Sequence, residues 1–282
     1  MKIGYLMKYS RDEVKWAAKV GFKCLAISFA EDLLKVTDST AKNIRKDFQE
    51  NNLKISALGT GMLNHLSPDE KEKKLNNQRF IRAMNLCPIL GTNTISTNVF
   101  GNPDISIEEN IPEYQQVFGE YADKAKRLGI KIAIENCPHV HTYPIKIGNI
   151  ALSPYAWNLM FKAIPSKTVG LEFDPSHLVW LGIDYLKAAK KFGNRIYHVH
   201  AKDTEIIQDA LDEKGIYGDS WWRYRIPGWG VVDWQKFFAT LLDTDYQGDI
   251  DIEHEDPVFE GPRFKEGLIL GLRHLSQFIT QN

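Results

Sequence analysis

Residues 168–203 read TVGLEFDPSHLVWLGIDYLKAAKKFGNRIYHVHAKD, a pattern that predicts a strand, a helix and a second strand. The first strand ends in Asp174, with His177 three residues later, and the second carries His200 and Lys202 near its end. Because alternate residues of a strand share a face, His200 and Lys202 point to the same side of the sheet. Two neighbouring parallel strands therefore bring a carboxylate and an imidazole to one end of a sheet, as a divalent metal site requires.

The same alternation of strands and helices runs along the whole chain. Apolar runs that predict strands lie at 2–7, 22–28, 53–60, 92–98, 130–136, 168–174, 195–203 and 248–256. Helices are expected at 11–20, 38–51, from Ser67 to about Leu90, and at 108–128, 153–164, 183–192, 233–243 and 262–280. Helical crossovers of this kind demand parallel strands.

Eight such units predict one closed (β/α)8 barrel, with residues 1–282 forming a single domain. The loop YLMKYS after the first strand lacks the glycine pattern of a dinucleotide-binding fold, which argues against an open doubly wound sheet. At the first helix, Ser10 and Glu13 have the spacing of a capping box.

Composition and charge indicate the compartment of the protein and the kinds of partner that it is expected to lack. The chain has 282 residues, a formal net charge of −1 and three cysteines without a CxxC pair, which is typical of reduced thiols in a cytoplasmic protein. The beginning of the chain becomes charged before any run of signal-peptide length, and no segment has 18 uninterrupted apolar residues, so no leader and no membrane partner are expected. The near-neutral charge argues against a nucleic-acid partner.

Four successive predicted strands, the fifth to the eighth, each end in a potential metal ligand. These residues are Glu135, Asp174, His200 and Glu253. In a (β/α)8 barrel the active site lies at the carboxyl ends of the strands. Three carboxylates and one imidazole make an oxygen-rich site, which suits Mn²⁺, Mg²⁺ or Co²⁺ and also admits Zn²⁺. Because close buried carboxylates repel one another, the arrangement itself calls for one divalent cation.

The segments IAIEN, GLEFDPSHLVWLGID, IYHVHAKD, RIPGWGVVDW and DIDIEHED resemble those of the xylose isomerase-like sugar phosphate isomerase/epimerase superfamily. The resemblance implies one cation, with Mn²⁺ favoured, held by Glu135, Asp174, His200 and Glu253. It further implies that Glu135 and Glu253 act as acid and base on a sugar, or sugar derivative, through an enediolate. The histidine that matches His177 contacts the substrate in such enzymes.

The same superfamily contains apurinic endonucleases, which bind three zinc ions through additional histidines. This chain has His65 after the third strand but Ser96 and Thr97 at the end of the fourth. Residues 204–232 contain no histidine. The resemblance therefore does not extend to the second and third metal sites, and a DNA-repair activity is set aside.

Several further residues are candidates for contacts with the substrate. His177 is one, with a helix-capping role as the alternative, and His65 is another. Lys202 either holds a substrate oxygen and stabilises the enediolate or pairs with Asp203 or Glu255. Glu255 is also a rival to Glu253 for the cation, because both share one face of the strand.

The long connection 204–232 interrupts the alternation and includes the sequence WWRYRIPGWG at 221–230. Aromatic faces stack on sugars and arginine forks bind oxygens, so Trp222, Arg223 and Arg225 are predicted to contact substrate from a lid. The alternative is that the tryptophans simply pack this insertion onto the barrel. No glycine-rich phosphate loop follows the last two strands, which favours a sugar without a phosphate.

The sequence thus predicts a metal-dependent sugar isomerase or epimerase. A second reading keeps the site but ends in β-elimination from a 3-keto-glycoside, and a third is a sugar-binding barrel without catalysis. Barrels of this kind often associate through their outer helices, so a homo-oligomer is compatible with the sequence.

Overall fold

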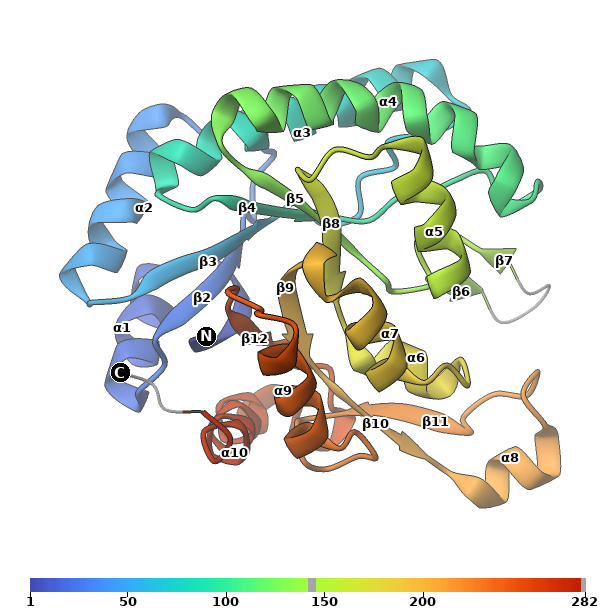
Figure 1. The fold of residues 1–282 in the computed structure, drawn as a ribbon. Coiled ribbons are helices and arrows are strands. Elements are labelled where there is room, and N and C mark those ends of the chain that lie inside the picture. Colours follow the sequence, from blue (N-terminus) through green and yellow to red (C-terminus); the bar gives the residue numbers. More distant parts are fainter. Residues whose placement is uncertain (142–145, 280–282) are drawn as a thin grey trace.

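The computed structural model describes residues 1–141 and 146–279 and contains a closed barrel of eight strands (Figure 1). The strands follow one another around the barrel in the order β1-β12-β9-β8-β5-β4-β3-β2, and each neighbouring pair is parallel. Their bounds are β1 (Ile3–Lys8), β2 (Cys24–Ser28), β3 (Lys54–Gly59), β4 (Thr94–Thr97), β5 (Lys131–Glu135), β8 (Val169–Phe173), β9 (Ile196–Ala201) and β12 (Ile250–Ile252). The predicted (β/α)8 barrel is confirmed.

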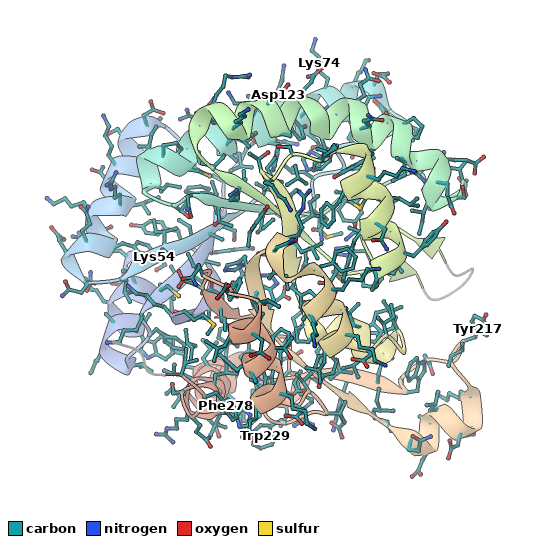
Figure 2. The ribbon with its side chains drawn as sticks, in the orientation of Figure 1. Lys54, Lys74, Asp123, Tyr217, Trp229 and Phe278 are labelled. Carbon is teal, nitrogen blue, oxygen red and sulfur yellow. The ribbon has the colours of Figure 1, made fainter. Side chains whose placement is uncertain are left out.

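Helices surround the barrel, as Figure 1 shows. They are α1 (Arg11–Val20), α2 (Asp38–Glu50), α3 (Glu70–Leu90), α4 (Ile107–Leu128), α5 (Pro154–Ala163), α6 (Pro175–Trp180), α7 (Tyr185–Phe192), α9 (Trp234–Asp243) and α10 (Phe264–Leu275), whereas α8 (Gln208–Lys214) lies away from the barrel. Short 3₁₀ turns lie at Gly193–Arg195, Pro257–Phe259 and Gly261–Arg263. Charged side chains such as Lys74 and Asp123 project outward from α3 and α4 (Figure 2). Within the described ranges, every helix is too short or too polar to cross a membrane.

The capping prediction for the first helix is wrong. Ser10 is the N-cap residue of α1 but makes no side-chain capping bond, and the carboxylate of Glu13 instead accepts a hydrogen bond from Tyr5 at 3.2 Å. A complete capping box is found at α4, where Ser106 and Glu109 exchange side-chain and backbone hydrogen bonds. At α1 a tertiary partner therefore competes with the local motif for the glutamate.

Strand alternation fixes which side chains face the barrel interior. Ile134, Phe173, Val199 and Ile252 are fully buried, and Phe173 stacks on Phe237 of α9 at 5.7 Å between ring centroids. These apolar residues lie under the outer helices. Their polar neighbours along the strands therefore face inward, toward the barrel axis and its mouth.

The connection 204–232 is more ordered than the sequence predicts. It forms an antiparallel hairpin of β10 (Asp203–Ile206) and β11 (Trp222–Arg225), with α8 between the two strands. Figure 1 shows this excursion beside α6, and Tyr217 at its far end is 77% exposed (Figure 2). A second, shorter pairing joins β6 (Val140–His141) to β7 (Lys146–Ile147).

Candidate metal centre and active site

Four neighbouring strands bring the predicted ligands to the carboxyl mouth of the barrel. Glu135 is the last residue of β5, Asp174 follows β8, His200 lies in β9 and Glu253 follows β12. These strands are consecutive around the barrel, in the order β5-β8-β9-β12. The four side chains therefore converge because of strand order and alternation, as the sequence predicts.

Two groups of described residues could hold a metal ion and share no member; one of them consists of Glu172, His198 and His200. Ligand atoms of Glu135, Asp174, His177 and Glu253 all lie within 4.8 Å of one another and could hold a metal ion. His200 adjoins this group, with Nδ1 at 3.0 Å from Glu135 Oε1 and 3.2 Å from Glu253 Oε2. His177 therefore lies among the carboxylates, and not at the rim of the barrel as a residue that only contacts substrate would.

The donor set and two unsatisfied atoms fit a cation. Asp174 Oδ2 and His177 Nε2 are buried and, among the described residues, have no hydrogen-bond partner, although they lie 3.2 Å apart. Buried polar atoms are almost always satisfied, so two such atoms facing one cluster of carboxylates point to a group that they both bind. Three carboxylates with one or two imidazoles supply the oxygen-rich set that divalent cations prefer.

The charges of the cluster are strongly coupled. Burial favours the neutral form of Glu135, but the His177 and His200 imidazoles beside it hold the pKa of its carboxyl well below the usual range. Burial opposes protonation of His177 as well, yet the Asp174 carboxylate raises the pKa of this imidazole to about 10. The Glu135 carboxyl is therefore ionised at neutral pH and available to a cation or to a proton.

Lys202 lies inside the cluster rather than at its rim. Its Nζ is 2.6 Å from Glu253 Oε2, 2.8 Å from Glu255 Oε2 and 3.4 Å from Asp174 Oδ2. Burial of Glu253 would raise the pKa of its carboxyl, but the Lys202 ammonium beside it lowers that pKa to about 2. The side chain of Glu255 is 49% exposed, so this rival to Glu253 lies toward the solvent.

Two asparagines hold the ligands in place, and the sequence reasoning missed the role of Asn98. Asn98 donates to Glu135 Oε2 at 3.0 Å from the end of β4. Asn136 accepts from the backbone N–H of Asp174 at 2.8 Å and donates to its carbonyl at 2.9 Å. Both are the last residues of predicted strands, at 92–98 and 130–136, and this position is the signal that identifies such residues.

His65 is not placed as predicted. Its ring is fully buried and packs edge-on against Phe80 of α3 and against Phe118 and Tyr121 of α4. One ring nitrogen pairs with the Thr97 hydroxyl at 2.8 Å, and burial lowers the pKa of the imidazole to about 3. Because no surface remains for a ligand, His65 is a core residue and the predicted substrate contact is corrected.

The hairpin arginines are occupied by partners within the protein. Arg223 donates to Glu205 at 2.8 Å, and Arg225 donates to Glu205 at 2.5 Å and to Asp256 at 2.9 Å. The guanidinium of Arg225 is buried in these ion pairs. The structure therefore corrects the expectation that both arginine forks are free to bind substrate oxygens.

Of the aromatic residues in the hairpin, Trp222 packs against a helix and Tyr224 contacts the site. Trp222 stacks on Trp180 of α6, with ring centroids 4.6 Å apart and planes inclined by 2°. Tyr224, which the sequence reasoning missed, bonds through its hydroxyl to His177 Nδ1 at 2.8 Å, and its ring lies 4.3 Å from Lys202 Nζ. Tyr224 is thus the hairpin residue in direct contact with the cluster.

Cavities open at both ends of the barrel. One of about 360 Å³ lies at the carboxyl ends of β1, β2 and β3, and its lining includes Lys8, Ser28 and Gly59. A larger one of about 520 Å³ lies at the amino-terminal face and is lined in part by Lys54 and Lys131. Among the described residues, those that could hold a metal ion are not in the lining of either cavity.

Fold and site together define a (β/α)8 barrel with a candidate metal centre at its carboxyl mouth. The family model of the xylose isomerase-like TIM barrel matches residues 14–275, and the chain belongs to that family.

Comparison with known proteins gives distant relatives. Inosose dehydratase of Bacillus thuringiensis (strain Al Hakam) is 26% identical over 227 residues, which are 78% of this chain and 75% of the relative. The uncharacterised protein YfiH of Bacillus subtilis (strain 168) is 29% identical over 153 residues, about half of each chain at 48%.

Solved structures share the fold. A crystal structure of D-psicose 3-epimerase in the presence of D-fructose has a TM-score of 0.77 at 17% identity and covers 99% of both chains. The IOLI protein with a zinc atom has a TM-score of 0.77 at 21% identity and covers 100% of both chains.

Proposed function

We propose that this chain is a divalent-metal-dependent sugar isomerase or epimerase that moves a proton next to a carbonyl group. The observation that supports this best is the placement of Glu135 and Glu253, which reach the same imidazole nitrogen of His200 from two different strands. Of two carboxylates on either side of one cluster, the ionised one can take a proton from one face of a carbon, and the other, once protonated from solvent, can deliver its proton to the opposite face.

The residues that would hold the cation are Glu135, Asp174, His200 and Glu253, with His177 close enough to contribute. When bound, the cation would polarise the carbonyl and vicinal hydroxyl oxygens of a sugar and so make the adjacent C–H acidic. Mn²⁺ is the favoured ion because the donor set is rich in oxygen, and Zn²⁺ is compatible with it.

The chain's own residues carry the proton transfer. One glutamate removes the proton and the other returns it, with an enediolate between the two steps. The Lys202 ammonium, 2.6 Å from Glu253, lies where it stabilises the negative charge of that enediolate. Asn98 holds Glu135 by its other oxygen, at 3.0 Å, and so orients the carboxylate for the transfer.

The substrate class is a sugar or sugar derivative without a phosphate. Arg223 and Arg225, which the sequence predicts to contact substrate oxygens and which could have bound a phosphate, are instead paired with Glu205 and Asp256. The cavity of about 360 Å³ at the ends of β1 to β3 opens at the same end of the barrel as the centre and provides room for the rest of a small sugar.

A lyase is the second candidate, and the relationship to an inosose dehydratase favours it. Removal of a proton next to a carbonyl is also the first half of a β-elimination, in which a hydroxyl or glycosidic oxygen then departs. The same cluster serves both reactions, and the fate of the enediolate decides between them.

Deuterium exchange tests both candidates. The Mn²⁺-loaded protein is incubated in D₂O with neutral ketoses, aldoses, keto-inositols and 3-keto-glycosides, and Glu135→Gln serves as the control. Deuterium in a rearranged sugar supports the isomerase or epimerase, whereas an unsaturated product or a released aglycone supports the lyase. An absence of C–H exchange across the panel, with metal bound, would remove both.

A further inference from the structure

A second layer of buried charge lies directly beneath the candidate centre. Glu172 of β8, His198 of β9 and Asp251 of β12 are each at most 3% exposed. Glu172 is in register with His198, and Asp251 is in register with His200. The proton transfer proposed above uses none of these three residues, although burying two carboxylates and an imidazole is costly unless they are paired.

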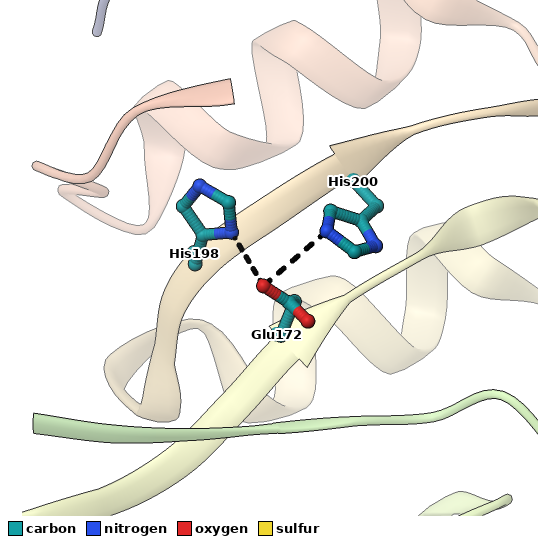
Figure 3. A group of neighbouring side chains, drawn as sticks. All are labelled: Glu172, His198 and His200. Atoms are coloured by element: carbon teal, nitrogen blue, oxygen red, sulfur yellow. Dashed lines mark hydrogen bonds and ion pairs between the residues drawn. The ribbon is translucent and has the colours of Figure 1, made fainter. Parts of the chain in front are cut away.

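The layer is a continuous chain of contacts that ends on a proposed metal ligand. Figure 3 shows Glu172 between the two imidazoles, with Oε1 at 2.7 Å from His198 Nδ1 and 3.3 Å from His200 Nε2. On its other side, His198 Nε2 lies 2.6 Å from Asp251 Oδ2, and Ser56 donates to that same oxygen at 2.5 Å. Every member is therefore held by its neighbour.

Glu172 and His198 also belong, with His200, to the second group that could hold a metal ion. In the structure, however, both ring nitrogens of His198 are hydrogen-bonded to carboxylates that lie away from the mouth, which favours a supporting role for His198. The contacts are those of an imidazole that donates on both sides. The layer instead has the form of an outer shell, in which a carboxylate orients a ligating histidine.

The two nitrogens of His200 face different partners. Nε2 faces Glu172, whereas Nδ1 faces Glu135 and Glu253. A ring that donates its Nε2–H to a carboxylate presents Nδ1 as the nitrogen that can bind a cation.

We infer that Glu172 is a positioning residue that sets the orientation and tautomer of His200, and that His198, braced by Asp251, holds Glu172 in place. This inference rests on the cation site of the proposed function. Because one oxygen, Oε1, contacts both imidazoles, the role requires an acceptor at that point rather than a full carboxylate.

The test measures binding of Mn²⁺ alone, counted from the electron paramagnetic resonance signal of the free ion. We expect Glu172→Met to weaken Mn²⁺ binding by about 10- to 100-fold, as loss of an outer-shell partner does. Glu172→Gln keeps an acceptor oxygen and should recover most of that loss. Tyr246→Phe, which removes a buried hydroxyl bond to the Asp249 carbonyl and leaves the Glu172 chain intact, is the control for destabilisation.

Nitrogen-15 spectra of the Zn²⁺-loaded protein, labelled at histidine, distinguish the two possible roles of Glu172. A positioning role predicts that its loss changes the protonation pattern of His200, whereas a merely structural role predicts no such change. In the wild type His200 should show a protonated Nε2 and a metal-bound Nδ1, and Glu172→Met should mix or reverse this pattern. If Glu172→Met does not fold, the Glu172→Gln spectrum decides, because a weaker amide acceptor must shift the Nε2 proton upfield.

Three results would overturn the inference alone: wild-type Mn²⁺ affinity in Glu172→Met, equal losses in the Met and Gln variants, or an unshifted Nε2 proton in Glu172→Gln. A wild-type protein that binds no Mn²⁺ would instead remove the proposed function.

Discussion

The ammonium nitrogen of Lys202 lies 2.6 Å from Glu253 Oε2, which places a cation of the chain itself inside the candidate metal centre. The same nitrogen is 3.4 Å from Asp174 Oδ2. A bound metal ion and this ammonium repel each other, so Lys202→Met should raise the affinity for Mn²⁺ by about tenfold. Turnover should fall by about 10²-fold, because the enediolate loses a stabilising charge.

Manganese titration and steady-state kinetics on one preparation check both parts of this prediction. Lys236→Met is a suitable control, because Lys236 is an exposed lysine whose ion-pair partner is Asp233. Unchanged Mn²⁺ affinity in Lys202→Met would mean that the ammonium moves aside without resisting the ion.

Substitution of Glu135 or Glu253 should lower activity much more than substitution of Glu255, which lies two residues after Glu253. Glu135→Gln and Glu253→Gln are each expected to lower turnover by about 10²- to 10⁴-fold, because each removes an acid or base. Glu255→Gln should keep most of the activity, since this side chain is 49% exposed and contacts Lys202 at 2.8 Å. Kinetics and metal content of the three variants decide whether Glu253 or Glu255 serves the site. A larger loss of turnover in Glu255→Gln than in Glu253→Gln would reverse the assignment of Glu253.

Most of the barrel is predictable from the sequence because its strands are apolar runs between amphipathic helices. The first helix, predicted at 11–20, is observed at Arg11–Val20. The hairpin of β10 and β11 escapes prediction because its pairing depends on contacts across the connection, such as the register of Glu205 with Arg223. Such pairs cannot be found from periodicity within either strand.

Only those residues of the candidate site that lie at strand ends can be predicted from the sequence. Glu135 and Glu253 lie at the mouth because of alternation, which is visible in the sequence. The partners of Lys202 and the contact between Tyr224 and His177 depend on distances between elements remote in the chain. For the same reason His65, which follows a strand as the ligands do, could not be assigned to the core in advance.

An ion pair at the wall of the carboxyl-end cavity gives a pH-dependent prediction. Hydrogen bonds from Arg79 hold the pKa of Asp32 at about 2, below its ordinary value of 3.8. A depressed folded-state pKa contributes stability above the unfolded value, and this contribution is lost as the pH falls through the folded value. Wild type should therefore be more stable than Arg79→Met by about 1 kcal/mol at about pH 5, after allowance for solvent screening.

The difference should shrink by about half at about pH 3, as protonation of Asp32 in the unfolded chain takes over. Urea unfolding of both proteins at the two pH values measures it. A difference that stays constant or grows on acidification would contradict the assigned pair.

Close packing beneath the centre gives a stability prediction. A methyl group at Gly4 would overlap the Asp251 carboxylate and the carbonyl of Cys24, because β1 passes close to both. Gly4→Ala should therefore lower the free energy of unfolding by about 2–3 kcal/mol. Gly119→Ala in α4, where nothing lies within 4 Å of the added carbon, should instead raise it by about 0.5–1 kcal/mol. Chemical denaturation of the pair tests this, and equal effects would disprove the overlap.

The hairpin contact with the site gives the last prediction. Tyr224→Phe removes the hydroxyl that lies 2.8 Å from His177 Nδ1 but keeps the ring over Lys202. Because His177 then loses the bond that orients its ring, we expect KM for the sugar to rise by about tenfold, which corresponds to about 1.4 kcal/mol of binding, while kcat changes less. Tyr224→Leu also removes the ring and should lower kcat further, whereas Tyr217→Phe at the exposed end of the same excursion should behave as wild type. Steady-state kinetics on the three variants distinguish a hairpin that shapes the site from one that only covers the barrel, since a covering role predicts wild-type kinetics for Tyr224→Phe.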